Sequence, residues 1–205
     1  MEVLDIHMIN NIIADSLKSG ITYADYRNLV SKLVEENSTT GNEKTEDMVN
    51  YTMLNDRRMK RWDKTVKVSD EMRTKIENFN RKVTWLVIIE SWCGDAAHIA
   101  PVINKVAELN DNINFNVVLR DENDILMNHF LTNGGKAIPK LIMIDNKSNN
   151  VVATFGPRPI VATDMVNAYK SKNGMLTPEF KEDLQRWYNK DKGQSTIEDL
   201  VNLLS

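Results

Sequence analysis

The chain has 205 residues, 41% of them hydrophobic, and a formal net charge of -3. This composition suits a globular protein that buries its own core, either as one domain with extensions or as two small domains. The slightly acidic balance argues against a protein built to bind nucleic acid or an anionic membrane. The single cysteine, Cys93, excludes an internal disulfide and any metal site made of several cysteines.

The chain carries no recognisable targeting or membrane segment. Its first residues, MEVLDIHMINNIIADSLK, lack the basic and continuous apolar regions of a secretory signal. No stretch approaches the roughly 20 apolar residues that a membrane-spanning helix needs. These features predict a cytoplasmic protein.

Residues 1–80 predict a helical N-terminal extension packed on the core. Thr22 caps a helix that runs to Lys32 or Leu33, with Asp25 in the manner of a capping box, and Ser69 caps a short helix that ends near Phe79. Between them, the polar stretch ENSTTGNEKTED reads as a loop and the next residues resume a helix. That helix offers several residues for burial: Met48, Tyr51, Met53, Leu54, Met59 and Trp62.

Residues 81–172 predict an α/β unit. VTWLVIIES is a continuous apolar run typical of a central parallel strand, and a helix from Asp95 to Leu109 follows it. A second strand (INFNVVLRD) and a helix (ENDILMNHFL) come next. KLIMID and VVATFG then form a hairpin across the turn NKSNN, before a closing helix (IVATDMVNAYKS). This order predicts a mixed central sheet with flanking helices.

Residues 173–205 predict a C-terminal helical tail. Thr177 followed by Pro178 starts one helix, and Gly193 stops it. Ser195 and Glu198 have the spacing of a capping box for the last helix.

Two motifs in the α/β unit resemble those of the thioredoxin family. WCGDAAHIAP places Trp92, Cys93 and Gly94 at the end of the central strand, with Pro101 inside the following helix. Ile138-Pro139 precedes the next strand in the way of the family's cis-proline, and Gly156 also matches. The resemblance covers about residues 83–171 and implies a thioredoxin-like fold. The helical N-terminal block is also similar to that of a bacterial WCGD-type subgroup.

Three departures from the family pattern bear on activity. Ala96 stands where the resolving cysteine would be, Asp95 replaces the family's proline, and Val87 replaces its buried proton-shuttling aspartate. Dithiol reductase activity is therefore not expected.

The acidity of Cys93 depends on two opposing effects. A helix N-terminus favours a thiolate by about 0.3–1 kcal/mol, and by up to about 2 kcal/mol where it is partly buried. Carboxylates within about 4–6 Å shift a neighbouring pKa by roughly 1–3 units. Because Asp95 and Glu90 lie close in sequence, we expect Cys93 to titrate like an ordinary cysteine.

The remaining candidate residues surround this motif. The residues at Ile138-Pro139 are expected to pair with an extended substrate segment, with Trp92 shaping the surface. Arg158 should lie near Pro139, where it could hold a carboxylate or a small-thiol anion.

The histidines and the basic stretch are better explained by ordinary structural roles than by a functional site. His98 is spaced to pair with Asp95 but is more typical of a helix residue at the core edge. His7 and His129 show no ligand spacing with it, so neither a metal nor another cofactor is expected. The basic stretch RRMKRW reads as a solvated helix face rather than a nucleic-acid site.

Two functions remain open. The leading hypothesis is a thiol-disulfide redox protein that acts through Cys93 alone, with a protein or a low-molecular-weight thiol as partner. The alternative is a redox-inactive binding or adaptor module that holds a partner segment on the Trp92/Pro139 surface.

Overall fold

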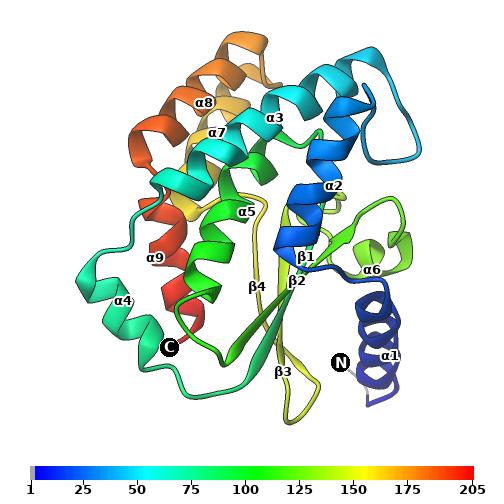
Figure 1. The fold of residues 1–205 in the computed structure, drawn as a ribbon, viewed down its shortest axis with the longest axis vertical. Coiled ribbons are helices and arrows are strands. Elements are labelled where there is room, and N and C mark those ends of the chain that lie inside the picture. The colour runs from blue at the N-terminus through cyan, green and yellow to red at the C-terminus, as the bar shows by residue number, and fades with distance from the viewer. Residues whose placement is uncertain (1–2) are drawn as a thin grey trace.

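The computed structural model describes residues 3–205, and these contain one four-stranded sheet (Figure 1). The strand order is β2-β1-β3-β4, with β1 and β2 parallel and the other pairs antiparallel. This is the predicted mixed α/β architecture, with helical segments before and after the sheet. The strands are β1 Val83–Ile89, β2 Ile113–Leu119, β3 Lys140–Asp145 and β4 Val151–Phe155.

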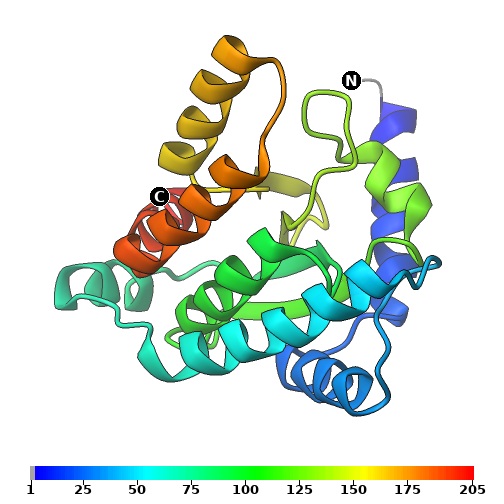
Figure 2. The ribbon, with the colours of Figure 1, turned by 90° about the horizontal axis from the view of Figure 1, so that it is seen from above.

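The helices lie around this sheet. α5 covers one face, and α3 and α9 pack on α5, whereas α1 and α6 pack together near the β2 edge (Figure 2). None of the helices among the described residues is long and apolar enough to cross a membrane. The helices are α1 Val3–Lys18, α2 Tyr23–Glu35, α3 Glu46–Thr65, α4 Asp70–Glu77, α5 Gly94–Ala107, α6 Asp124–His129, α7 Ile160–Asn173, α8 Pro178–Asp191 and α9 Gln194–Leu203.

The central strand β1 explains where the site forms. All seven of its residues are buried, and β2 and β3 flank it on its two sides. β1 runs antiparallel to β3, with Ile88 opposite Lys140. The segment that follows β1 therefore meets the segment that precedes β3, and this brings Cys93 next to Ile138-Pro139.

A single hydrophobic core connects the sheet with the terminal helices. It includes Tyr26 of α2, Trp62 of α3 and Leu184 of α8 together with the residues of β1. The helical segments outside the α/β unit are thus part of the same packed interior.

Most of the predicted helix starts are confirmed. Thr22, Ser69 and Thr177 each accept a hydrogen bond from the backbone N–H three residues ahead. The prediction of a capping box at Ser195 is wrong. The chain turns at Lys192 and Gly193, which both have positive φ, so α9 begins at Gln194 and Ser195 already lies inside the helix. Ser195 instead donates its hydroxyl to Asp191 at 2.5 Å.

The buried face of α3 differs from the predicted one. Met59 and Trp62 are buried as expected, but Tyr51 is 50% and Leu54 39% exposed. α3 buries Thr52, Asn55 and Asp56 instead, and Thr52 and Asn55 form hydrogen bonds to the buried Ser91. Where a helix packs on polar groups, its own buried residues are polar, so that face shows no hydrophobic periodicity in the sequence.

Candidate functional site

Cys93 lies at the turn between β1 and α5, where it is the N-cap residue of the helix. Its Sγ accepts a hydrogen bond from the N–H of Ala96 at 3.5 Å and donates one to the carbonyl oxygen of Ile138 at 3.3 Å. The side chain is only 8% exposed. The sulfur is therefore enclosed between the first turn of α5 and the segment before β3.

The thiol is much less acidic than the sequence led us to expect. Burial is the largest cause, followed by the negative charge of Asp95, and together they raise the pKa of Cys93 to about 12. The backbone N–H groups of Ala96 and Asp95 and the guanidinium of Arg158 act in the opposite direction. The prediction that Cys93 titrates like an ordinary cysteine is wrong, because burial, which the sequence does not show, raises its pKa more than any neighbouring charge does.

Alkylation of the folded protein should show this raised pKa. Only the thiolate reacts with iodoacetamide, and the thiol stays protonated until the pH approaches its pKa. At pH 8 we expect the folded protein to react about a thousandfold more slowly than free cysteine, whose pKa is about 8.5. Asp95→Asn should accelerate the reaction, since it removes the second-largest cause of the shift.

The unfolded chain supplies the control for this measurement. In concentrated urea the only cysteine loses its burial and should alkylate like free cysteine. A midpoint near pH 8.5 in the folded protein would contradict the enclosed geometry.

Asp95 is held by two residues from distant parts of the chain. Its Oδ2 lies 2.5 Å from Nη2 of Arg158, and the Tyr188 hydroxyl donates to its Oδ1 at 2.9 Å. Burial raises the pKa of Asp95, while the charge of Arg158 and the Tyr188 hydrogen bond oppose that rise. Arg158 thus binds a carboxylate, but this carboxylate is the side chain of Asp95 and not part of a ligand.

His98 does not pair with Asp95. Its Nδ1 accepts from the indole N–H of Trp62 at 2.8 Å, which leaves the proton on Nε2 to be donated to Oε1 of Gln185 at 2.7 Å. The ring stacks on Tyr188 with centroids 4.4 Å apart. Burial lowers the pKa of His98 to about 4, so a neutral imidazole joins α3, α5 and α8 at neutral pH.

Helices α3 and α8 cover the turn that carries Cys93. A Cβ atom added at Gly94 would lie 3.6 Å from Nη1 of Arg58 and 3.9 Å from Nε2 of Gln185. Together with Tyr188 on Asp95, these residues restrict access to the cysteine.

Glu90 and Trp92 lie on the other side of this turn. Glu90 is fully buried; its Oε1 accepts from the N–H of Asp121 at 2.9 Å, and Oε2 has no partner among the described residues. Burial is the largest of the causes that raise the pKa of Glu90. The guanidinium of Arg120 lies 4.8 Å from the ring centre of Trp92, which remains partly exposed.

Two proline loops meet beside Cys93. The structure has cis peptide bonds at Ile138-Pro139 and at Gly156-Pro157, the second of which we did not anticipate. Gly156 has φ +106°, and a Cβ there would lie 2.2 Å from the carbonyl oxygen of Pro139. Only glycine fits where these loops touch.

The sequence did not reveal a hydroxyl cluster formed by the loop before α3. Ser91 Oγ lies 2.8 Å from Thr52 Oγ1 and 3.2 Å from Thr39 Oγ1, and Thr40 Oγ1 accepts from the N–H of Ser91 at 2.8 Å. All four residues are buried. No local pattern in the sequence indicated this cluster, because its members come from segments that are far apart in the chain.

The structure thus brings Cys93, Asp95, Ile138, Pro139 and Arg158 together, with Glu90 and Trp92 on the opposite flank. Among the side chains of residues 7–205, no group of three or more His, Cys, Asp or Glu residues is placed to hold a metal ion.

The fold and this turn define a thioredoxin-like protein with one enclosed thiol. The chain belongs to the thioredoxin family: a family model described as thioredoxin matches residues 41–170, a range that includes α3 and α4. No curated protein matches the chain.

Two solved structures share the fold. A protein of unknown function from Pseudomonas aeruginosa is 16% identical with a TM-score of 0.58, over 74% of this chain and 84% of that one. An HIV epitope-scaffold is 15% identical with a TM-score of 0.57, over 76% of this chain and 89% of that one. At these identities the likeness concerns the fold alone.

Proposed function

We propose that the protein is a redox-inactive binding module that uses the thioredoxin fold to hold an extended segment of a partner protein. The observation that carries this proposal is the hydrogen bond from the Cys93 thiol to the carbonyl oxygen of Ile138 inside a closed site. Thiol-disulfide exchange requires a thiolate, and a pKa of about 12 keeps the sulfur protonated at neutral pH. Ala96 supplies no second thiol to resolve a mixed disulfide.

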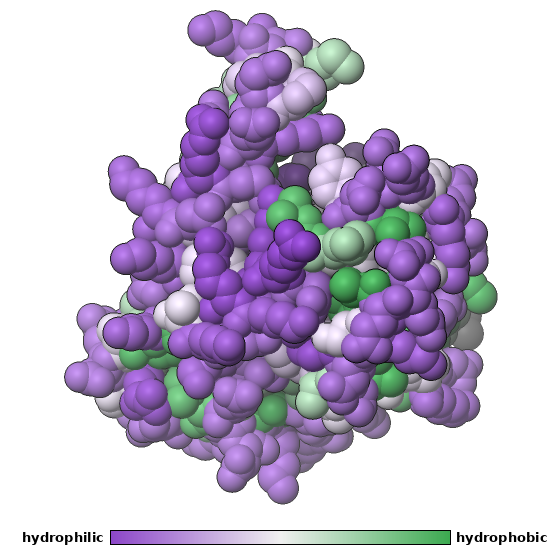
Figure 3. Space-filling view, turned by 45° about the horizontal axis from the view of Figure 1, so that its top comes forward, coloured by the Kyte–Doolittle hydropathy of each residue, from purple (hydrophilic) through white to green (hydrophobic). Residues whose placement is uncertain are grey.

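The partner surface in this proposal surrounds the closed cysteine. Trp92, Gly94, Asp95 and Arg158 are partly exposed there. Apolar residues are exposed on both flanks in the chain, with Leu131 ahead of the Pro139 loop and Ile160 just after Arg158. Figure 3 shows the molecule tilted by 45° from the view of Figure 1 so that its top comes forward, and apolar side chains gather in the middle of this view among polar ones. A mixed surface of this kind suits a peptide segment that combines apolar side chains with backbone hydrogen bonds.

Partner capture with two variants should test this function. Cys93→Ser should retain the partners captured by the wild-type protein, because a serine hydroxyl can also donate to the Ile138 carbonyl. Trp92→Ala should weaken capture, because it removes the largest partly exposed side chain of the surface. Immobilised proteins with quantitative mass spectrometry of the bound fraction provide the measurement. Partners that disappear with Cys93→Ser, or that elute only with a reductant, would overturn the proposal.

A monothiol redox function is the second candidate, and the position of the sulfur favours it. Cys93 Sγ lies at the N-terminus of α5, where the N–H of Ala96 already donates to it. In that function the thiolate attacks one sulfur of a small disulfide, a new S–S bond forms, and the other sulfur leaves as a thiolate. A Cys93 adduct formed with oxidised glutathione at neutral pH would support this candidate against the binding module.

A further inference from the structure

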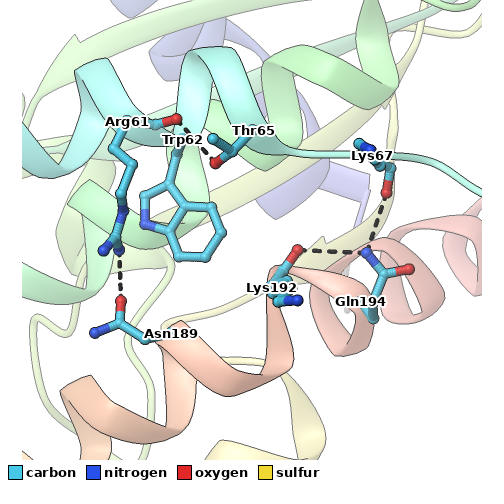
Figure 4. A pocket seen from close by; sticks show the side chains of 7 residues that line it. All are labelled: Arg61, Trp62, Thr65, Lys67, Asn189, Lys192 and Gln194. Carbon is cyan, nitrogen blue, oxygen red and sulfur yellow. Dashed lines mark hydrogen bonds between the residues drawn. The ribbon is translucent and has the colours of Figure 1, made fainter.

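A second candidate site lies between the end of α3 and the turn from α8 to α9. It is a pocket of about 410 Å³, within the size range of small-ligand sites (Figure 4). It shares no lining residue with the turn around Cys93, so a role for this pocket is separate from the proposed function and goes beyond it. The lining residues are Arg61, Trp62, Thr65, Lys67, Asn189, Lys192 and Gln194.

The charges of this pocket have one sign. Arg61, Lys67 and Lys192 come from three separate segments, and no carboxylate lines the pocket. None of the three forms an ion pair with a carboxylate whose position the structure describes. The two acidic residues of α3 nearest to Arg61 in sequence, Asp56 and Asp63, are both bound to Arg27 of α2. The pocket therefore concentrates uncompensated positive charge.

The helix ends at the pocket do not cancel this charge. α3 and α8 both terminate there, and free carbonyl groups at a helix C-terminus would repel an anion. Gln194 Nε2 donates to the carbonyls of Lys67 at 3.0 Å and Lys192 at 3.3 Å, and Thr65 Oγ1 donates to that of Arg61 at 2.9 Å. The nearest acidic side chain in sequence, Asp191, is engaged by Ser195.

The pocket is also held in place before any ligand arrives. Trp62 is fixed by its hydrogen bond to His98, and Arg61 lies over the indole ring while donating to Asn189. Lys192 caps α8 in a left-handed conformation with φ 59°. Basic groups on a fixed framework lose less conformational freedom on binding than basic groups on mobile segments.

We propose that this pocket binds the phosphate group of a small phosphorylated molecule. A phosphate dianion offers several acceptor oxygens in different directions, which suits a pocket whose lining carries one guanidinium and two ammonium groups. The volume leaves space beside the phosphate for an organic part. The concave shape and the acidic balance of the whole chain favour a small ligand over a nucleic-acid strand.

Calorimetric titration with glycerol 2-phosphate and with inorganic phosphate, at matched ionic strength, tests this site. The wild-type protein should bind glycerol 2-phosphate saturably at one site. Lys67→Glu and Lys192→Glu should each weaken binding by about tenfold or more, because each reverses a charge that contacts the ligand. Equal binding of inorganic phosphate would identify free phosphate as a sufficient ligand and would still support the site.

Lys64→Glu and Lys190→Glu are the matched controls, since they make the same charge change outside the lining, in the last turns of α3 and α8 just before Lys67 and Lys192. They should alter affinity by less than about threefold at 0.1 M salt, where exposed charges are screened. Absence of saturable binding, or an equal loss in lining and control variants that remain folded by circular dichroism, would overturn the proposal.

Discussion

Ala96→Cys should give this protein a reducible internal disulfide, which the wild-type chain with its single cysteine cannot form. Ala96 is in the first turn of α5, and its N–H already lies 3.5 Å from the Cys93 sulfur. Substitution adds one heavy atom and places a second thiol where the family carries its resolving cysteine. An oxidant such as diamide can then join the two sulfurs, with both thiols oxidised and the diamide reduced. Because Cys93 stays enclosed, with a pKa of about 12, turnover of external disulfides should remain slow.

Diamide oxidation followed by mass analysis reports the disulfide, and insulin reduction coupled to thioredoxin reductase checks that turnover stays slow. Ala97→Cys is the matched control, because Ala97 is equally buried but is one residue further along the helix. It should not form the disulfide. Robust insulin reduction by the wild-type protein would refute the conclusion that its dithiol chemistry is lost.

Arg158→Ala should lower the free energy of unfolding by about 3–5 kcal/mol, the usual cost of leaving one charge of a buried pair without its partner. The side chains of Arg158 and Asp95 are 22% and 12% exposed, so solvent screens their interaction little. Without Arg158, burial should raise the pKa of Asp95 further, and the carboxyl should take up a proton on folding. The destabilisation should therefore be larger at pH 7 than at about pH 5. Urea denaturation at both pH values measures it.

Two further variants separate the loss of the ion pair from the loss of packing. Arg158→Ala combined with Asp95→Asn should recover much of the lost stability, because no charge is then left buried. Arg186→Ala removes an arginine whose ion pairs are 60–73% exposed, and should cost only about 0–1 kcal/mol. Equal effects at Arg158 and Arg186 would mean that the Asp95 pair is not buried in solution.

The alkylation and stability experiments address the same structural feature. Helices α3 and α8 reach the turn around Cys93 through Arg58, Gln185 and Tyr188, and they convert an exposed family motif into an enclosed one. If alkylation is slow and the Arg158 pair is strong, the enclosed state is the stable state of the protein in solution. A binding role for the surrounding surface then needs no reaction at the sulfur.

The sequence alone was sufficient to predict the secondary-structure elements that depend on interactions between residues close together in the chain. The buried run from Val83 to Ile89 predicted the central strand, and the hairpin β3–β4 followed from two apolar runs across a turn. The side chains of Thr22, Ser69 and Thr177 marked helix starts because capping bonds span only three residues. Two short motifs at the right separation were enough to identify the family.

Only the tertiary structure decided how the site is closed and charged. Asp95 and Tyr188 are 93 positions apart, and no local pattern indicates that one hydrogen-bonds the other. The hydroxyl cluster at Ser91 and the basic pocket at Trp62 likewise combine segments that no periodicity connects. Burial is a collective result of packing, and it sets the acidity of Cys93 more strongly than any neighbour in sequence. The motif in the sequence therefore determined where the cysteine lies, whereas the helices packed over it determined that its thiol stays protonated.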